Sequence, residues 1–400
     1  MLISTEQELC QQRTLPRSAV LRTTLNFTPS WFSVVMGTGV ISILLHTAPH
    51  QFPGMSIIGT VFYVANIVLI VLFTLVTVAR YVLYPWALGR MLSHPTQSLF
   101  LGTIPMGLAT IVNATVLVAV PAYGQWAKDL AWALWWLDVL LTGLSTFGMP
   151  LIMFQLHRHS LESMTGVWLL PIVPAVVAAA SGGLVATILP PAHAVITLLV
   201  SYALWGIGMS VSFMVMALYF HRLSVYHLPD AEVIVSAYLP LGPCGQGAYG
   251  LIQIAQAGQK VLEITGFAGQ HTAGQIIFII STVVAIMIWG LGLWWLVHGT
   301  VCVLLRIRSD KFKPSIGWWG FIFPLGVFVA ATIKLGDVLP SAFFAYLSLV
   351  LLACLFILYL VVAFVTVKGV FDGSLLVAPC MSDLQRCHGK AEDSPPCTRG

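Results

Sequence analysis

Ten apolar stretches of about twenty residues or more constrain this chain most, because each is long enough to cross a bilayer as a helix. Charged residues make up 8% of the 400 residues, and apolar residues make up 58%. A soluble domain carries about 25% charged residues. The sequence therefore predicts an all-α, polytopic membrane protein. The ten stretches cover residues 28–47, 55–79, 99–120, 130–155, 167–188, 192–219, 233–256, 275–304, 316–334 and 341–367.

The distribution of Lys and Arg predicts the orientation of these helices. With the N-terminus in the cytosol, all 18 Lys and Arg residues fall in cytosolic segments except Lys128, Lys260 and Lys334. Because positively charged loops stay in the cytosol, we expect ten transmembrane helices with both termini cytosolic. By this scheme residues 1–26 form a cytosolic N-terminal segment, residues 27–370 the transport domain, and residues 371–400 a disordered cytosolic tail.

Prolines and glycines divide the ten stretches into two alternating sets. A proline inside a helix frees the carbonyl one turn earlier, and lipid does not tolerate such unpaired backbone groups. We therefore expect five helical hairpins, in which broken odd helices line a central pore and smooth even helices lie outside. The alternative is that glycine and proline serve only helix packing. The even stretches hold Pro150, whereas the odd stretches hold Pro29, Pro105, Pro171, Pro174, Pro240, Pro243 and Pro324.

The polar residues of the odd stretches indicate what such a pore would pass. Hydroxyl, amide and backbone N–H groups bind an anion without holding it too tightly to leave. Rings of Asp or Glu, which suit a cation pathway, are missing from these stretches. A small anion is therefore the favoured substrate. The residues expected to line the pore or bind the substrate are Ser33, Gly37, Thr38, Thr103, Pro105, Asn113, Pro174, Ser181, Pro243, Gln246 and Pro324.

Two charged residues within the stretches are further candidates, since a charge in the membrane is costly to keep. Asp138 is the carboxylate nearest the middle of a span, and Lys334 lies at the outer boundary of the ninth. Asp138 either ties an outer helix to an inner one or couples transport to protons. Lys334 either reaches to the membrane interface or attracts anions to the mouth of the pore.

Motifs of soluble enzymes do not account for the chain. A G-x-G-x-x-G pattern occurs at Gly245, Gly247 and Gly250, but it lies inside an apolar stretch and not between a strand and a helix. The sequence has no Walker A or HExxH motif, and its seven cysteines form no CxxC pair. We therefore expect no enzyme, cofactor, metal or nucleic-acid partner. A membrane sensor or scaffold without transport is the remaining alternative class.

Five motifs, taken together in order, resemble a known family. They are NFTPSWFSVVMGTG (26–39), LFLGTIPMGLATIVN (99–113), WWLD (135–138), LPLGPCGQGAYG (239–250) and GWWGFIFPLG (317–326). Over residues 26–370 the chain resembles the tellurite-resistance/dicarboxylate transporter family and, within it, the fungal sulfite efflux pumps. The resemblance implies ten helices around a central pore and a homo-oligomer, namely a trimer.

The resemblance also implies a gate and a substrate. In bacterial members and plant slow-anion channels a phenylalanine of the ninth helix plugs the pore. Phe323 lies at the similar position here, with Phe321 as the alternative. The implied function is export of sulfite or bisulfite across the plasma membrane, which detoxifies sulfite. Its rival within the family is proton-coupled transport of malate or another C4-dicarboxylate, with Asp138 as the proton relay.

Overall fold

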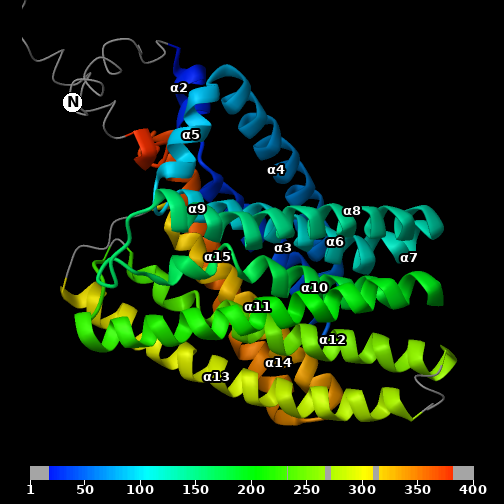
Figure 1. Cartoon of the computed structure of the whole chain (residues 1–400). Helices are drawn as coiled ribbons and strands as arrows, with labels where there is room; N and C mark the ends of the chain where they lie inside the picture. Colours follow the sequence, from blue (N-terminus) through cyan, green and yellow to red (C-terminus); the bar gives the residue numbers. More distant parts are fainter. Residues whose placement is uncertain (1–17, 232, 266–271, 310–314, 382–400) are drawn as a thin grey trace, which may run out of the picture.

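The computed structural model describes residues 18–231, 233–265, 272–309 and 315–381, and these residues form helices and turns without a strand (Figure 1). Within them, eight helical runs are long and apolar enough to cross a membrane, and α10 (Val173–Ala186) is a shorter apolar helix. The chain is therefore an all-helical, multi-pass membrane protein, as predicted. The eight runs are Pro29–Thr47, Met55–Leu83, Ser98–Tyr123, Gln125–Leu156, Pro191–Tyr226, Ala273–Arg306, Ile316–Val338 and Ala342–Phe371.

Each predicted span contains a helix of the structure. α6 continues through a π-helical turn (Thr115–Ala119) into α7 (Val120–Tyr123), and α8 continues through Leu144–Gly148 into α9 (Met149–Leu156). Short helices α2 (Ala19–Asn26) and α5 (Pro85–Ser93) lie outside the predicted spans. The remaining long helices are α3 (Phe32–Thr47), α4 (Met55–Leu83), α6 (Thr103–Ala114), α8 (Gln125–Gly143), α11 (Pro191–Tyr226), α12 (Leu241–Thr265), α13 (Ala273–Ser309), α14 (Trp319–Val338) and α15 (Ala342–Phe371).

Burial separates these helices into two sets. In the runs of α3, α6 and α14, 78% to 89% of the most apolar window is buried, and α10 and α12 are also mostly buried. In the runs of α4, α8, α11, α13 and α15 the buried share is 17% to 39%. The exposed positions of the second set carry large apolar side chains such as Leu75, Leu140, Met214, Met287 and Phe364. An apolar exposed face suits contact with lipid tails. We refer to the two sets as inner and outer helices.

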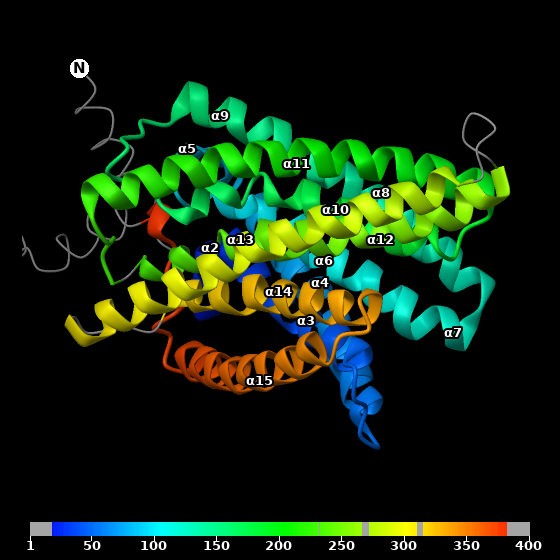
Figure 2. The ribbon, with the colours of Figure 1, turned by 90° about the horizontal axis from the view of Figure 1, so that it is seen from below.

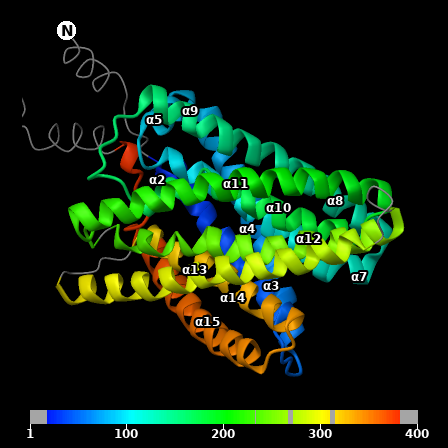
Figure 3. The ribbon, with the colours of Figure 1, turned by 60° about the horizontal axis from the view of Figure 1, so that its bottom comes forward.

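The inner helices contact one another in a closed cycle. α3 packs against α6, α6 against α10, α10 against α12, α12 against α14, and α14 against α3. Each outer helix contacts two neighbours of this cycle, as α11 contacts α10 and α12, and α13 contacts α12 and α14. Figure 2 shows α15 beside α14 at one edge of the bundle, and in Figure 3 the helices α10 and α12 run alongside α11 and α13.

The prolines do not lie where the sequence placed them. Each inner helix begins with a 3₁₀ turn, at Pro29–Trp31, Ser98–Gly102, Gly166–Leu169, Ile234–Tyr238 and Ile316–Trp318. Pro105, Pro174 and Pro243 then stand at the second or third position of the α-helix. Proline is favoured in the first turn of a helix because its fixed φ suits the helical backbone. Pro324, in contrast, lies inside α14. The predicted mid-membrane breaks are therefore wrong for most of these prolines, which mark helix starts instead.

Two glycines of the inner helices allow backbones to approach closely. A Cβ atom on Gly245 of α12 would lie 2.6 Å from the backbone nitrogen of Phe328 in α14. A Cβ atom on Gly183 of α10 would lie 2.7 Å from the backbone nitrogen of Ile254 in α12. Small residues at such contacts are typical of packed membrane helices. The three glycines of the G-x-G-x-x-G pattern lie within α12 and face other helices, namely α14 at Gly245, α11 at Gly247 and α10 at Gly250.

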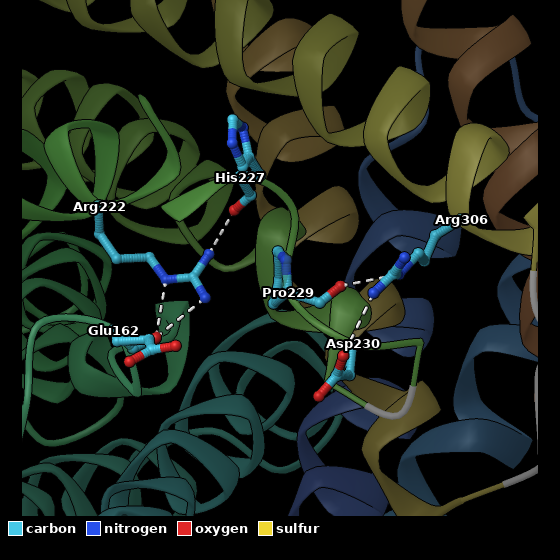
Figure 4. Close-up of polar contacts among 6 residues, drawn as sticks. All are labelled: Glu162, Arg222, His227, Pro229, Asp230 and Arg306. Atoms are coloured by element: carbon cyan, nitrogen blue, oxygen red, sulfur yellow. Dashed lines mark hydrogen bonds and ion pairs between the residues drawn. The ribbon is translucent and has the colours of Figure 1, made fainter. Parts of the chain in front are cut away.

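We call the end at which the inner helices begin the proximal end, and the opposite end the distal end. At the proximal end two arginines hold the connecting loops (Figure 4). Arg222 of α11 donates hydrogen bonds to the backbone oxygens of Glu162 and His227. Arg306 of α13 donates to the backbone oxygen of Pro229 and pairs with Asp230 at 3.2 Å.

Part of the predicted disordered tail packs on this same end. Ala378 and Met381 are fully buried, in a cluster with Leu25 of α2 and Ala87 of α5. Residues 382–400, like residues 1–17 of the predicted N-terminal segment, lie outside the described residues.

Candidate functional site

A cavity of about 610 Å³ opens at the proximal end, and all five inner helices contribute to it. Ser33, Thr103, Val173, Gly242 and Gly320 line it, one from each of α3, α6, α10, α12 and α14. The packed tail adds Ser374, Val377 and Pro379 to its wall. We call this space the proximal cavity.

All five inner helices begin next to the proximal cavity. The first N–H groups of a helix lack partners within the helix, and its N-terminus carries a partial positive charge. Here five helix starts surround one space, and their lining residues are uncharged. Such an arrangement attracts anions without a fixed cation to trap them.

A second, much smaller space of about 20 Å³ lies further along the inner ring. It is lined from the same five helices, and its polar residues are Thr110, Asn113, Gln246 and Tyr249. The Asn113 side-chain oxygen is buried without a hydrogen-bond partner in the described chain. The volume suffices for about one water molecule. We call this space the middle cavity.

Phe323 lies between these two spaces, since its side chain lines both the proximal and the middle cavity. It is 4% exposed. Phe321, two residues earlier, points elsewhere: its ring packs edge-on against Tyr238 at 5.0 Å between centroids, in a cluster with Ile234 and Val303. Of the two phenylalanines predicted as gates, Phe323 therefore lines both cavities and Phe321 lines neither.

A third cavity, of about 580 Å³, opens at the distal end. α12 contributes Gln253, Gln256, Gln259, Lys260 and Glu263 to it. The other lining residues are Leu184, Thr187, Phe278 and Lys334. We call it the distal cavity, and unlike the proximal cavity it carries fixed charges.

One face of α12 connects the three cavities. Gly242 lines the proximal cavity, Gln246 and Tyr249 the middle cavity, and Gln253, Gln256 and Lys260 the distal cavity. This spacing of three to four residues keeps the side chains on a single helical face.

α14 repeats the arrangement. Phe323, Val327, Ala330 and Lys334 follow at the same spacing and pass from the proximal to the distal cavity. The proximal and middle cavities therefore meet at Phe323, and the distal cavity follows them along α12 and α14.

The residues predicted from sequence divide between this path and helix packing. Ser33, Thr103 and Pro324 line the proximal cavity. Asn113 and Gln246 line the middle cavity, and Lys334 lines the distal cavity. Gly37 instead faces the ring of Trp319, and the Thr38 hydroxyl lies 3.2 Å from that of Tyr359 on outer helix α15. The remaining predicted residues, which line none of these cavities, are Pro105, Pro174, Ser181 and Pro243.

Asp138 lies apart from the path. It is fully buried on α8, and neither carboxyl oxygen has a hydrogen-bond partner among the described residues. On the same face of α8, Trp135 donates to the backbone oxygen of Ala178 in α10 at 2.9 Å. Asp138 therefore lies at the contact between an outer and an inner helix and lines none of the three cavities.

Several lining residues were not predicted from the sequence, among them Ser30, Thr110, Tyr249, Gln253 and Lys260. The signal that could have found the last three is the polar stripe on α12, which repeats every three to four residues from Gln246 to Lys260. Ser30 and Thr110 carry no comparable pattern.

Comparison with known proteins shows where this architecture belongs. The profile of the family described as "Voltage-dependent anion channel" matches residues 26–367. The Sulfite efflux pump SSU1 of Trichophyton rubrum is 42% identical over 337 residues, which are 83% of this chain and 88% of the relative. The protein of the same name from Arthroderma otae is 43% identical over 324 residues, covering 81% and 85% of the two chains.

A relative of lower identity is named for a different anion, malate. The Malic acid transport protein of Schizosaccharomyces pombe is 26% identical over 374 residues, which are 93% of this chain and 82% of the relative. The matched profile covers nearly the whole of residues 26–370, over which the five motifs predicted the tellurite-resistance/dicarboxylate transporter family and, within it, the fungal sulfite efflux pumps. That prediction is confirmed, and the chain belongs to the voltage-dependent anion channel family.

Proposed function

We propose that this protein is a channel-like exporter of sulfite or bisulfite in the plasma membrane. The observation that carries the proposal is the series of three cavities through the inner ring, narrowed at Phe323. The relatives named as sulfite efflux pumps support the choice of anion. Helices without catalytic motifs fit a transporter and not an enzyme.

The proposed route starts in the cytosol. We place the proximal end there because Arg80, Arg90, Arg158, Arg222 and Arg306 belong to segments at that end, whereas Lys128, Lys260 and Lys334 belong to the distal end. In this proposal ten helices form five hairpins around the pore, residues 27–370 are the transport domain, and both termini are cytosolic. The homotrimer implied by the family resemblance is part of the same proposal.

In the proposed mechanism each cavity has a distinct part. The helix starts of the proximal cavity concentrate the anion. Removal of the Phe323 ring from the path admits it to the middle cavity, where Asn113 and Gln246 offer amide donors. The distal cavity then receives the anion. A negative-inside membrane drives this direction by about 2.3 kcal/mol per charge per 100 mV.

The test is efflux from proteoliposomes of the purified protein, comparing sulfite with malate at two membrane potentials. We expect sulfite efflux that grows as the inside becomes more negative, in excess of protein-free liposomes. Absence of flux for both anions would favour a sensor or scaffold and overturn the proposal.

A second candidate is proton-coupled transport of malate or a related C4-dicarboxylate. It is favoured by the unpartnered carboxyl group of Asp138 within the described bundle, a group that can carry a proton, and by the malic acid relative. It predicts malate flux that follows a pH gradient. Because Asp138 lines none of the three cavities, any coupling would act through the contact between α8 and α10.

A further inference from the structure

The segment that follows α15 runs along the mouth of the proximal cavity. The chain turns at Gly373, whose φ of +70° is a conformation that favours glycine. Ser374, Val377 and Pro379 then form part of the cavity wall. The segment ends in a 3₁₀ turn at Pro379–Met381, which contacts α5 and lies beside α2 and α5 in Figure 1. It therefore reaches from an outer helix across the mouth to α5, and we call residues 374–381 the strap.

Side chains at the end of the strap divide between two environments. Ala378 and Met381 are fully buried and Cys380 is 9% exposed, in a cluster with residues of α2 and α5. Val377, in contrast, is 51% exposed, and both Val377 and Pro379 line the proximal cavity. Ala378, Cys380 and Met381 thus anchor the strap while its other residues form the wall.

Arg80 of α4 adds a polar anchor. Its guanidinium is fully buried and donates hydrogen bonds to the backbone oxygen of Phe27 at 2.6 Å and to the sulfur of Cys380 at 3.6 Å. A buried cation is costly unless its donors find partners. The strap therefore supplies one of the acceptors that this buried arginine uses.

The backbone of the strap is not tied to the helix bundle. The N–H groups of Leu375, Leu376 and Met381 donate to carbonyl oxygens within residues 369–378. Among the described residues, the strap shares no backbone hydrogen bond with any element other than α15, and the bond from Arg80 is its side-chain hydrogen bond to another helix. Segments held in this way open at a lower free energy than the helices of a core.

The rest of the cavity wall belongs to the inner helices, their first turns and the segments joined to them. The inner helices pack against one another along their whole buried faces, so they cannot leave the wall without disrupting the core. The strap is the part of the wall that can leave while every helix stays folded.

We propose that the strap is a movable lid on the proximal cavity. Held by Ala378, Cys380 and Met381, it narrows the entrance, and its release from α2, α4 and α5 widens the entrance. The inference deepens the proposed function, on which it rests for the role of this cavity as the entry for the anion. The movement itself does not require transport, so the two ideas are tested apart.

The experiment measures how fast a bulky, charged maleimide labels the wall of the cavity. Ser33, which lines the proximal cavity from α3, is replaced by Ser33→Cys in the full-length purified chain, and its labelling is followed by mass spectrometry. We expect Met381→Ala to speed this labelling about tenfold, because loss of a buried side chain weakens the closed position of the strap. A small methanethiosulfonate reagent should show a much smaller difference, since it passes a narrow entrance.

Two further variants complete the test. Phe371→Ala is the matched control, because Phe371 is 85% exposed at the end of α15 and lies outside the cavity wall, and it should leave labelling unchanged. Cys380→Ala is a milder change than Met381→Ala: it removes the acceptor for Arg80 and should also speed labelling.

Unchanged labelling in both strap variants, or equal acceleration for the bulky and the small reagent, would overturn the lid. Sulfite flux in the wild type together with unchanged labelling would refute the lid and spare the proposed function. Faster labelling in the strap variants, with no sulfite flux from any of the proteins in liposomes, would do the reverse.

Discussion

The side chain of Phe323 separates the proximal cavity from the middle cavity. Its ring lies between the proximal cavity of about 610 Å³ and the middle cavity of about 20 Å³. We expect Phe323→Ala to raise sulfite efflux from proteoliposomes several-fold, because truncation joins the two spaces. The measurement is initial efflux per reconstituted protein at a fixed membrane potential.

Phe321 provides the control on the same helix. Its ring packs against Tyr238 and Val303, away from the path. Phe321→Ala should lower the free energy of unfolding by about 3 kcal/mol, as at other buried aromatic sites. It should leave the sulfite flux per folded protein unchanged. Equal flux in wild type and Phe323→Ala would reduce Phe323 to a packing residue.

Asp138 separates the two candidate transport mechanisms. Asn has nearly the same shape as Asp but cannot carry a proton from one side to the other. Because Asp138 lines none of the cavities, we expect Asp138→Asn to keep voltage-driven sulfite efflux at the wild-type level. Loss of pH-gradient-driven uptake in the same variant would instead assign Asp138 to proton coupling.

We expect His159 to make the stability of the loop after α9 depend on pH. Its ring lies 4.8 Å from Trp168 and 5.3 Å from His157, and burial, followed by repulsion from His157, lowers the pKa of His159. The folded loop therefore binds a proton less readily than the unfolded one, so its stability falls as the pH drops below about 6.5. We expect hydrogen exchange in residues 157–168, corrected for intrinsic rates, to speed up on acidification. His159→Gln should remove part of this pH dependence, and an unchanged pH dependence would contradict the assignment.

Several side chains show which features of the site the sequence does not specify. Phe321 and Phe323 are equally apolar and two positions apart, so composition and period do not tell which one faces the path; the packing of α14 against α12 and α3 decides it. Thr38 and Ser181 are similar cases. Both belong to inner helices, yet Thr38 faces Tyr359 on α15 and Ser181 is buried away from the cavities.

At the scale of elements, the inner helices depend on close backbone contact. We expect Gly245→Ala to lower the melting temperature, because the added methyl group would meet the backbone of Phe328 at 2.6 Å and backbone atoms cannot rotate away. Gly206 of outer helix α11 has no neighbouring atom within 4 Å of a Cβ position. Gly206→Ala should therefore be neutral or stabilise the helix by up to about 1 kcal/mol. Equal melting temperatures for the two variants would argue against backbone contact as the reason for Gly245.

The proline pattern identified the buried helices correctly, but the expected reason, that proline breaks these helices, was wrong. Proline is compatible with a helix either where it breaks the hydrogen-bond ladder or in the first turn. Sequence alone does not distinguish the two, because the 3₁₀ turns before α6, α10 and α12 are as apolar as the helices that follow. The odd helices were identified correctly as the more buried ones, but four of their starts, and not their middles, are marked by proline.

At the scale of the whole molecule, length and hydropathy predicted the helical membrane architecture, since each apolar stretch had to become a helix. Length and hydropathy did not predict that residues 372–381 pack against the helix bundle. Residues 372–381 read as polar and short, yet Ala378 and Met381 are buried against α2 and α5, and Val377 lines the proximal cavity. Such a contact depends on where the last helix ends, which hydropathy does not give.

The series of cavities leads to a prediction about the whole molecule, namely the potential at which current reverses. A tenfold concentration ratio is worth about 1.4 kcal/mol, and a membrane potential contributes about 2.3 kcal/mol per charge per 100 mV. A purely anion-selective path should therefore reverse at about 60 mV per tenfold gradient if bisulfite passes and at about 30 mV if the sulfite dianion passes. The measurement is the current across a planar bilayer holding the purified protein, with equal pH on both sides. A reversal potential that moves when a pH gradient is then added, beyond the change in the bisulfite-to-sulfite ratio, would show coupled proton movement and contradict channel-like flow.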